Sequence, residues 1–275
     1  MTHMYQHDGY LVIPELLDAE ALALARKESV ALCRGERGAI EGVTAAGSED
    51  DATVLRRHLC VHFPHKISPV LCDLAVLPAA IAALTEVIGP NVKLMQSMLF
   101  IKSGGRPGQA WHQDEAHIPT RDRSLTAIWI ALDDATVDNG CLWVLPGSHR
   151  RGILYPERPQ TDPRFDCTRE AHGFPDEAAV PVELPAGTAV LFNGYLLHRS
   201  LPNTVPGGTR RALVNHYMSA ESLLPWFPPD PEVPMAGCDH RDILLVAGED
   251  PYAYKGTTDL MRPHVRADGK GGCVR

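Results

Sequence analysis

After residue 90 the sequence consists of short runs rich in β-branched and aromatic residues, separated by Gly, Pro and Asn. Runs of this kind are typical of β-strands, and many of them with irregular connections indicate two antiparallel sheets closed into a jelly roll. The predicted fold class is mainly β with flanking helices, a cupin-like double-stranded β-helix. The candidate strands are 92–103, 109–114, 125–134, 141–145, 180–184, 188–193, 195–200 and 210–219.

The part of the chain before residue 90 predicts helices that cover the outside of one sheet. Asp18 can cap a helix that runs to about Cys33, because its carboxylate accepts hydrogen bonds from free amides of the first turn. A second helical stretch opens at Ser68-Pro69 and ends at Gly89-Pro90, a natural stop.

The 275 residues, 44% of them hydrophobic, suffice for one sizeable core, so we interpret the whole chain as a single domain. Its predicted parts are an N-terminal helical part at about 15–90, a jelly-roll core at about 91–220 and a C-terminal extension at about 221–275. The polar, Pro-rich segment 150–178 predicts a long loop, of the sort that often forms a lid or a binding loop.

Charge and cysteine content narrow the class of partners and the compartment. A formal net charge of −8 gives no electrostatic case for nucleic acid or an anionic membrane as a partner. The seven cysteines are scattered without a C-x-x-C, which argues against disulfides and structural zinc. Neither a secretory signal nor an apolar run of about 18 residues is evident. We therefore expect a cytoplasmic location and a small-molecule substrate.

The segment Trp111-His112-Gln113-Asp114 carries the first chemical signal. Residues two apart in a strand point to the same face, so His112 and Asp114 would present an imidazole and a carboxylate to one interior. His198, in an apolar stretch predicted to be buried, is the obvious third ligand. Two histidines and one carboxylate on one face of a metal leave three positions open, the arrangement of non-haem Fe(II) oxygenases.

An arginine that could bind a carboxylate follows His198 in the sequence. Arg210 lies twelve residues after His198, and an arginine fork can grip a carboxylate through two parallel hydrogen bonds. Ser200 would lie on the same side as His198 and could donate its hydroxyl to that carboxylate. Arg210 and Arg211 should point to opposite faces, and we favour Arg210 as the inward one.

Together these segments resemble the phytanoyl-CoA dioxygenase family of 2-oxoglutarate-dependent oxygenases. The resemblance covers roughly residues 8–220, and the combination of motifs is highly specific although each alone is not. The segments that carry it are Asp8-Gly9-Tyr10-Leu11-Val12-Ile13-Pro14, Lys102 before Trp111-His112-Gln113-Asp114, Asn139-Gly140-Cys141-Leu142-Trp143-Val144-Leu145-Pro146-Gly147-Ser148-His149, and His198-Arg199-Ser200-Leu201-Pro202-Asn203 followed by Arg210.

The resemblance implies the same iron triad, with Arg210 and Ser200 on the distal carboxylate of 2-oxoglutarate. It also suggests Gln96, Lys102 and Trp129 near the cosubstrate. A lysine that faces a barrel interior needs an anionic partner, so Lys102 either meets 2-oxoglutarate or faces water on a strand turned over. For Gln96 and Trp129 a core or rim role is an equal alternative. Candidate substrate-pocket residues are Met98, His117 and His216.

The implied reaction consumes 2-oxoglutarate and O2 on Fe(II), releases succinate and CO2, and hydroxylates an unactivated C–H bond of a small or medium-sized metabolite. Ascorbate is the expected activator in vitro. Asp114 disfavours halogenation, because related halogenases replace this carboxylate with a small residue. Desaturation, epimerisation and ring closure would use the same triad. A jelly-roll metal-binding protein or metal-dependent isomerase stays open as the alternative, although it would not need Arg210 with Ser200.

Overall fold

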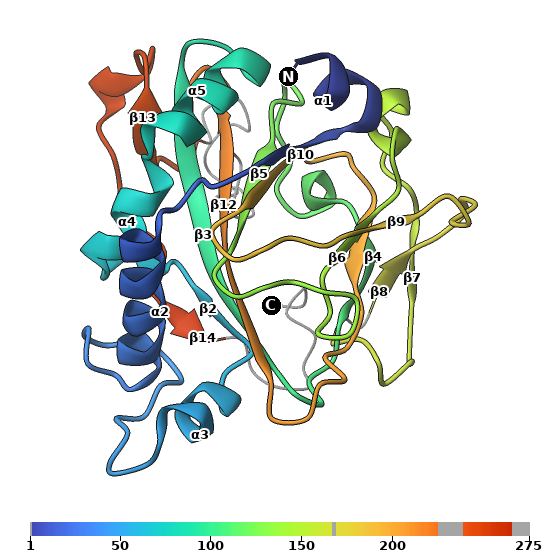
Figure 1. The fold of residues 1–275 in the computed structure, drawn as a ribbon. Helices are drawn as coiled ribbons and strands as arrows, with labels where there is room; N and C mark the ends of the chain where they lie inside the picture. Colours follow the sequence, from blue (N-terminus) through green and yellow to red (C-terminus); the bar gives the residue numbers. More distant parts are fainter. Residues whose placement is uncertain (1, 167–168, 225–238, 266–275) are drawn as a thin grey trace.

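The computed structural model describes residues 2–166, 169–224 and 239–265 (Figure 1). Two antiparallel sheets enclose a shared interior, and helices cover the outer face of the larger sheet (Figure 1). This arrangement confirms the predicted jelly roll with flanking helices. The division of the chain into one domain with three parts stays a prediction.

The larger sheet has eight strands among the described residues. Seven of them follow one another in space, and an eighth, β13 (Leu244–Ala247), pairs with β3. The spatial order is β1 (Tyr10–Ile13), β10 (Ala189–Asn193), β5 (Thr126–Ala131), β12 (Thr209–Ser219), β3 (Val92–Ser103), β2 (Cys60–His62) and β14 (His264–Val265).

The smaller sheet lies opposite and supplies three predicted site residues. Its order is β4 (Gln109–His112), β11 (His198–Ser200), β6 (Leu142–Val144) and β9 (Val180–Val182). Several candidate strands were predicted too long, and two of these bear on the site. The stretch 109–114 ends as a strand at His112, and 195–200 becomes a strand only at His198, because Asn193 holds a turn by accepting hydrogen bonds from the Tyr195 and Leu196 amides.

The segment 150–178, predicted as a long loop, is not loop throughout. It contains the hairpin of β7 (Glu157–Pro159) and β8 (Arg169–Ala171), and the short η3 helix (Ser148–Arg151) overlaps its start. Gln113 ties this segment to the site: its side-chain amide donates to the Ile153 carbonyl at 3.0 Å, and its carbonyl oxygen accepts from the Tyr155 amide at 2.8 Å.

The helices follow the predicted capping signals. Asp18 caps α2 (Ala19–Cys33), where its carboxylate accepts from the Ala21 amide at 2.8 Å. The second predicted stretch is two helices, α4 (Pro69–Ala75) and α5 (Pro78–Val87), since Pro78 cannot continue a helix and begins a new one. The other helical segments are α1 (Thr2–Asp8), α3 (Asp51–Arg56), η1 (Pro64–Lys66), η2 (Asp114–Ala116) and η5 (Ala253–Lys255).

Within the described part of the chain, no single helix is both long and apolar enough to span a membrane. The pair α4–α5 reaches that length and hydropathy only across a bend of 42°.

Alternation along the central strands divides the apolar residues between two layers. On β12, Leu213 and Tyr217 face the helical layer, where they are fully buried among residues of α2, α4 and α5. Ala212 and Val214 face the other way, into the space between the two sheets, together with Trp129 of β5. The inward face of β12 and its neighbours therefore lines the interior of the barrel.

The C-terminal extension is fastened to the core through Lys66 at the end of η1. Its ammonium donates to the Asp242 carboxylate at 2.6 Å, to Asp259 at 2.8 Å and to the Met261 carbonyl at 2.9 Å. Asp242 in turn accepts from the amides of Leu260 and Met261. One half-buried carboxylate, that of Asp242, thus holds two parts of the extension against one lysine.

Candidate metal centre and active site

His112 and His198 are register partners on the antiparallel strands β4 and β11. Their ring centroids are 4.0 Å apart, and both side chains are buried. Strand pairing therefore brings together two imidazoles that are 86 residues apart in sequence, counting from 112 to 198.

Asp114 joins the pair from just beyond the end of β4. It begins η2 and is not in a strand, as the same-face argument assumed, but Gln113 keeps an extended backbone (φ −128°, ψ 127°). The alternation of the strand therefore continues for one more residue. Asp114 Oδ1 lies 3.7 Å from His112 Nε2 and 3.5 Å from His198 Nε2.

Backbone carbonyls orient both imidazoles toward this point. His112 Nδ1 lies 2.8 Å from the Ala110 carbonyl oxygen, and His198 Nδ1 lies 2.9 Å from that of Leu196. Because a carbonyl can only accept, each Nδ1 carries the proton and each Nε2 lone pair is left for a metal. Burial, with His198 nearby, holds the pKa of His112 well below its usual value and keeps the ring neutral.

The three side chains fit one metal ion. One ligand atom from each lies within 4.8 Å of the others, and the described residues contain no second such group. Burial alone would raise the pKa of the Asp114 carboxyl, but His198, His216 and His112 outweigh it and hold that pKa well below its usual range. The donor set, two neutral imidazoles and a carboxylate, is the one expected for Fe(II).

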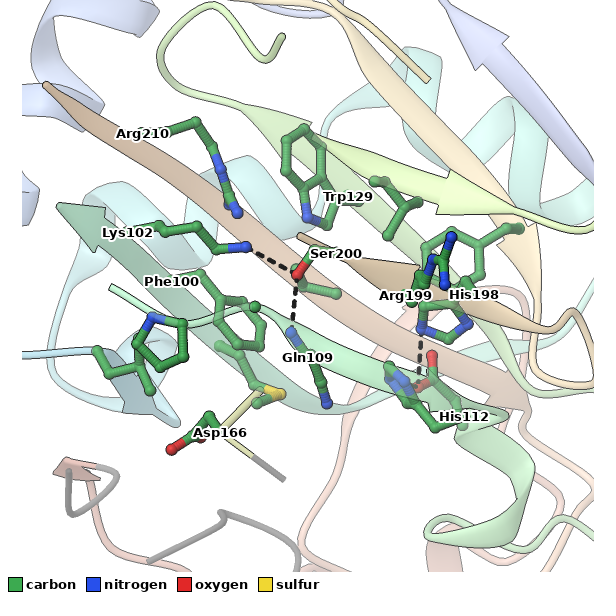
Figure 2. Close-up of a pocket in the computed structure, with 18 of the residues that line it drawn as sticks. Phe100, Lys102, Gln109, His112, Trp129, Asp166, His198, Arg199, Ser200 and Arg210 are labelled. Atoms are coloured by element: carbon green, nitrogen blue, oxygen red, sulfur yellow. Dashed lines mark hydrogen bonds and ion pairs between the residues drawn. The ribbon is translucent and has the colours of Figure 1, made fainter. Parts of the chain in front are cut away.

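A cationic subsite lies at the other end of the same cavity (Figure 2). Lys102 of β3 and Arg210 of β12 are register partners there. The Lys102 ammonium donates to Ser200 Oγ at 2.8 Å and to the Leu201 carbonyl at 2.7 Å, and Arg210 Nη2 donates to the Gly140 carbonyl at 2.9 Å. These residues place two cationic side chains and a hydroxyl together at one end of the cavity.

Arg211 occupies the opposite face of β12. Its guanidinium makes a two-pronged ion pair with Asp133, with Nη2 and Nε each 2.8 Å from a carboxylate oxygen. Arg210, in contrast, lines the cavity and is 3% exposed. Of the two adjacent arginines, Arg210 is therefore the one in a position to bind a cosubstrate.

Burial disfavours the charged forms of both Lys102 and Arg210. Burial, with Arg210 nearby, holds the pKa of Lys102 well below its usual value, and burial lowers the pKa of Arg210 to about 10. Arg210 stays charged at neutral pH. Its Nε is buried without a hydrogen-bond partner in the described structure. Such a pair is stabilised by an anion that enters the cavity.

The other sequence-predicted residues divide into two groups. Met98, Trp129 and His216 line the cavity, and the Arg210 guanidinium lies over the Trp129 ring, 5.3 Å from its centroid. Gln96 is buried beside His216 as its register partner on β3 but is not part of the lining. His117 also lies outside the lining, and its Nε2 is 3.6 Å from Glu157.

The structure adds residues that the sequence reasoning missed. The cavity is also lined by Gln109, Phe192 and Asp166. The backbone amide of Gln109 donates to Ser200 Oγ at 3.2 Å. Gly140 has φ +81°, and a Cβ there would come within 2.9 Å of Lys102 Nζ and 2.3 Å of the Leu201 carbonyl oxygen. The Asn139-Gly140 pair is typical of a turn, whereas Asp166 follows from no pattern in the sequence.

Comparison with known proteins agrees with this geometry. The sequence model described as "Phytanoyl-CoA dioxygenase (PhyH)" matches residues 5–212. The chain belongs to the phytanoyl-CoA dioxygenase family. It is 32% identical over 162 residues to phytanoyl-CoA dioxygenase 1 of Oryza sativa subsp. japonica, covering 58% of this chain and 57% of the relative. It is 27% identical over 232 residues to the human peroxisomal phytanoyl-CoA dioxygenase, covering 79% and 67%. The chain thus spans a little over half of the first of these family members.

Solved structures of non-haem 2-oxoglutarate-dependent enzymes share the fold. The epimerase SnoN from nogalamycin biosynthesis superposes with a TM-score of 0.64 at 21% identity, over 89% of this chain and 96% of its own. The carbocyclase SnoK from the same biosynthesis gives 0.65 at 23%, over 89% and 94%. EctD from S. alaskensis gives 0.62 at 22%, over 83% and 80%. Members of this fold therefore include epimerases and carbocyclases, and the fold alone does not select one reaction.

Proposed function

We propose that this chain is an Fe(II)- and 2-oxoglutarate-dependent oxygenase that hydroxylates an unactivated C–H bond of a small or medium-sized metabolite. The observation that supports it most strongly is that one cavity is lined both by the candidate iron ligands and by cationic side chains that could bind a carboxylate. His112, Asp114 and His198 lie at one end, and the Arg210 and Lys102 cations lie at the other.

Each of these residues has a definable task. His112, Asp114 and His198 would hold Fe(II), which supplies the activation of O2 coupled to decarboxylation of 2-oxoglutarate. Arg210 and Lys102 would bind the distal carboxylate, and Ser200 adds a hydroxyl between them. The Trp129 ring lies against the Arg210 guanidinium and would shield the ion pair between Arg210 and the distal carboxylate from water. These contacts fix the orientation of the cosubstrate relative to the iron ligands.

The rest of the cavity supports a metabolite with an apolar body. Leu59, Met98 and Phe100 line it, whereas Lys102 and Arg210 are engaged by the cosubstrate in this proposal. Known structures of the fold bind small molecules: SnoN was crystallised with Fe3+, alpha ketoglutarate and nogalamycin RO, and EctD with 2-oxoglutarate and 5-hydroxyectoine. We propose a metabolite of that size class for this chain.

A metal-dependent isomerase or a plain metal-binding protein is the competing function. It would use the same triad but has no need of a carboxylate anchor. Buried Arg210 and Lys102 are suited to be such an anchor, and this favours oxygenase chemistry. Epimerisation, desaturation and ring closure consume the same cosubstrate, and only the product of the true substrate separates them from hydroxylation.

The test measures succinate formed from 2-oxoglutarate with Fe(II), O2 and ascorbate, in the wild type, in Asp114→Ala and in Asp138→Ala, a control at an exposed carboxylate. We expect turnover in the wild type and the control and its loss in Asp114→Ala. Anaerobic binding of 2-oxoglutarate to the Fe(II) form, followed by charge-transfer absorption, needs no substrate. Tight zinc binding by a wild type that neither binds 2-oxoglutarate nor forms succinate would favour the alternative.

A further inference from the structure

His216 is buried directly behind the carboxylate of the triad. It lies on β12, on the same inward face as Arg210 and Val214, and it is 4% exposed. Its Nε2 is 3.2 Å from Asp114 Oδ2. Its other nitrogen, Nδ1, is buried with no hydrogen-bond partner in the part of the chain that the structure describes.

The two oxygens of Asp114 face different neighbours. Oδ1 points to the Nε2 atoms of His112 and His198, at 3.7 and 3.5 Å, which is the direction of the metal. Oδ2 points to His216. A carboxylate with one oxygen toward the metal and the other on a buried donor is held in a fixed orientation.

The protonation of His216 differs from that of the two ligand histidines. His112 and His198 carry their proton on Nδ1, because each Nδ1 faces a backbone carbonyl. His216 faces a carboxylate oxygen through Nε2, and an ionised carboxylate can only accept, so the proton is on Nε2. The only metal-binding group found among the described residues consists of His112, Asp114 and His198. His216 is thus built as a donor to a ligand.

We infer that His216 is a positioning residue that keeps Asp114 bound to the metal through Oδ1 alone. This inference rests on the proposed function. If Asp114 bound through both oxygens, it would fill a fourth position on the metal and leave two open. A bidentate 2-oxoglutarate together with O2 needs three. The hydrogen bond to Oδ2 occupies the oxygen that would otherwise close the third position.

Substitutions at 216 can separate this role from simple packing. The side-chain amide nitrogen of Gln reaches about as far as Nε2 of His, and that of Asn about as far as Nδ1. His216→Gln therefore keeps a hydrogen-bond donor near Asp114 Oδ2. His216→Asn also carries an amide donor, but its side chain is too short to reach Oδ2. His216→Leu fills the space without a donor. Far-ultraviolet circular dichroism and the melting temperature check that each variant folds.

The first measurement is the affinity for Co(II), which reports on the triad without any turnover. Loss of a hydrogen bond to a metal ligand lowers metal affinity by roughly 10–100-fold. We expect that loss for His216→Asn and His216→Leu, and an affinity within about threefold of the wild type for His216→Gln, which retains the donor. Equal affinities in all four proteins would overturn the inference, as would a Gln variant as weak as Asn.

The second measurement is anaerobic binding of 2-oxoglutarate to the Fe(II) form, followed by its charge-transfer absorption. Asn and Leu variants saturated with Fe(II) should bind 2-oxoglutarate more weakly or with a displaced band, and Gln should match the wild type. A wild type that shows no band refutes the proposed function itself. A wild-type band that is unchanged in His216→Leu and His216→Asn refutes only the role of His216. If His216→Leu fails to fold, the comparison of Gln with Asn decides.

Discussion

Lys102 and Arg210 both donate to the carbonyl oxygen of Gly140, at 3.4 and 2.9 Å. They are register partners on adjacent strands, both are buried, and no carboxylate in the described part of the chain lies within ion-pair distance of either. A carbonyl offsets only part of the cost of burying two like charges. A carboxylate that enters the subsite would offset the rest of this cost. This is the physical basis of the proposed 2-oxoglutarate site.

Replacing Arg210 should weaken cosubstrate binding, whereas replacing Arg211 should not. Arg210→Met removes a charge-assisted contact of about 2–3 kcal/mol, so we expect the Kd for 2-oxoglutarate to rise by roughly 30–100-fold. Arg211→Met is the matched control, since it breaks the ion pair with Asp133 on the outer face and changes stability alone. Calorimetric titration measures both. Equal losses of affinity in the two variants would contradict the assignment.

Lys102→Met should separate stability from binding. Removing a buried cation beside Arg210 relieves like-charge repulsion, so the melting temperature without cosubstrate should be unchanged or higher. The same change should raise the Kd for 2-oxoglutarate about tenfold or more, because one of two cations is gone. Thermal shift with and without 2-oxoglutarate shows both effects. A large loss of stability without cosubstrate would indicate that Lys102 is structural.

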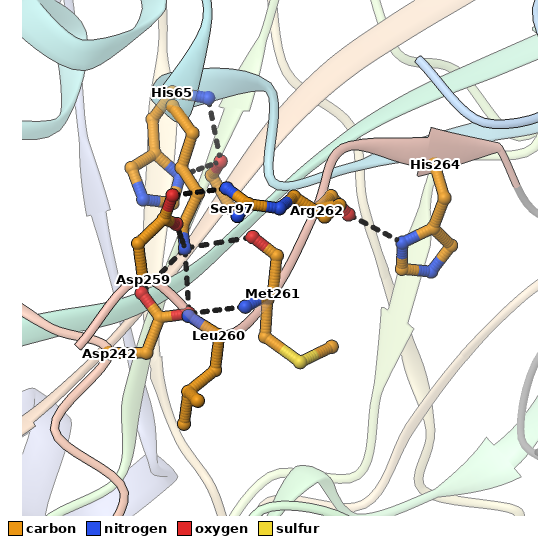
Figure 3. A network of polar contacts seen from close by, with 9 residues as sticks. His65, Ser97, Asp242, Asp259, Leu260, Met261, Arg262 and His264 are labelled. Atoms are coloured by element: carbon orange, nitrogen blue, oxygen red, sulfur yellow. Dashed lines mark hydrogen bonds and ion pairs between the residues drawn. The ribbon is translucent and has the colours of Figure 1, made fainter. Parts of the chain in front are cut away.

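Asp242 should matter far more than Asp259 for the C-terminal extension (Figure 3). The Asp242 side chain is 13% exposed and holds Lys66 and the Leu260 and Met261 amides, whereas Asp259 is 61% exposed. Asp242→Ala should destabilise this contact by about 1–3 kcal/mol, and Asp259→Ala should have a much smaller effect because its ion pair with Lys66 is exposed to solvent. Hydrogen exchange over 239–265 measures the difference, and similar exchange in the two variants would argue against it.

His65 should make the fold less stable in mild acid. Burial, with Lys66 nearby, lowers the pKa of His65 from 6.5 to about 4, while its Nδ1 contacts Ser97 Oγ. Between these two values the unfolded chain binds more protons than the folded one, so stability falls as the pH drops from 6.5 toward 4. The full shift corresponds to about 3 kcal/mol.

His65→Asn tests this, because its amide replaces the Nδ1 contact without titrating. The free energy of unfolding of metal-free wild type and variant is compared at pH 7 and pH 5 by urea titration. The wild type should lose more stability between the two pH values. Parallel losses would mean that His65 is not the group responsible.

Alternation explains why much of the site could be predicted from the sequence. A period of two residues puts Arg210 and Arg211 on opposite faces of β12, and it brings His112 and Asp114 to one side even though the strand ends at His112. These predictions need only the local direction of a strand. The turn at Asn139-Gly140 was equally readable, because a positive φ requires Gly or a small polar residue.

What could not be predicted depends on contacts between distant segments. The contact between His216 and Asp114 joins residues 102 positions apart and requires the register of β12 against its neighbours. β14 is two residues long and pairs with β2, and no local pattern marks so short a strand. The β7–β8 hairpin was hidden by a Pro-rich composition that usually indicates an irregular loop.

The pairing of β14 with β2 has a consequence for solubility. Without residues 239–265, β2 would present a row of unsatisfied amides and carbonyls at the border of the larger sheet, a template on which another copy could add a strand. A border strand of two residues is too short to serve as such a template. Loosening the Lys66 anchor is therefore expected to promote oligomers that grow by intermolecular β-pairing.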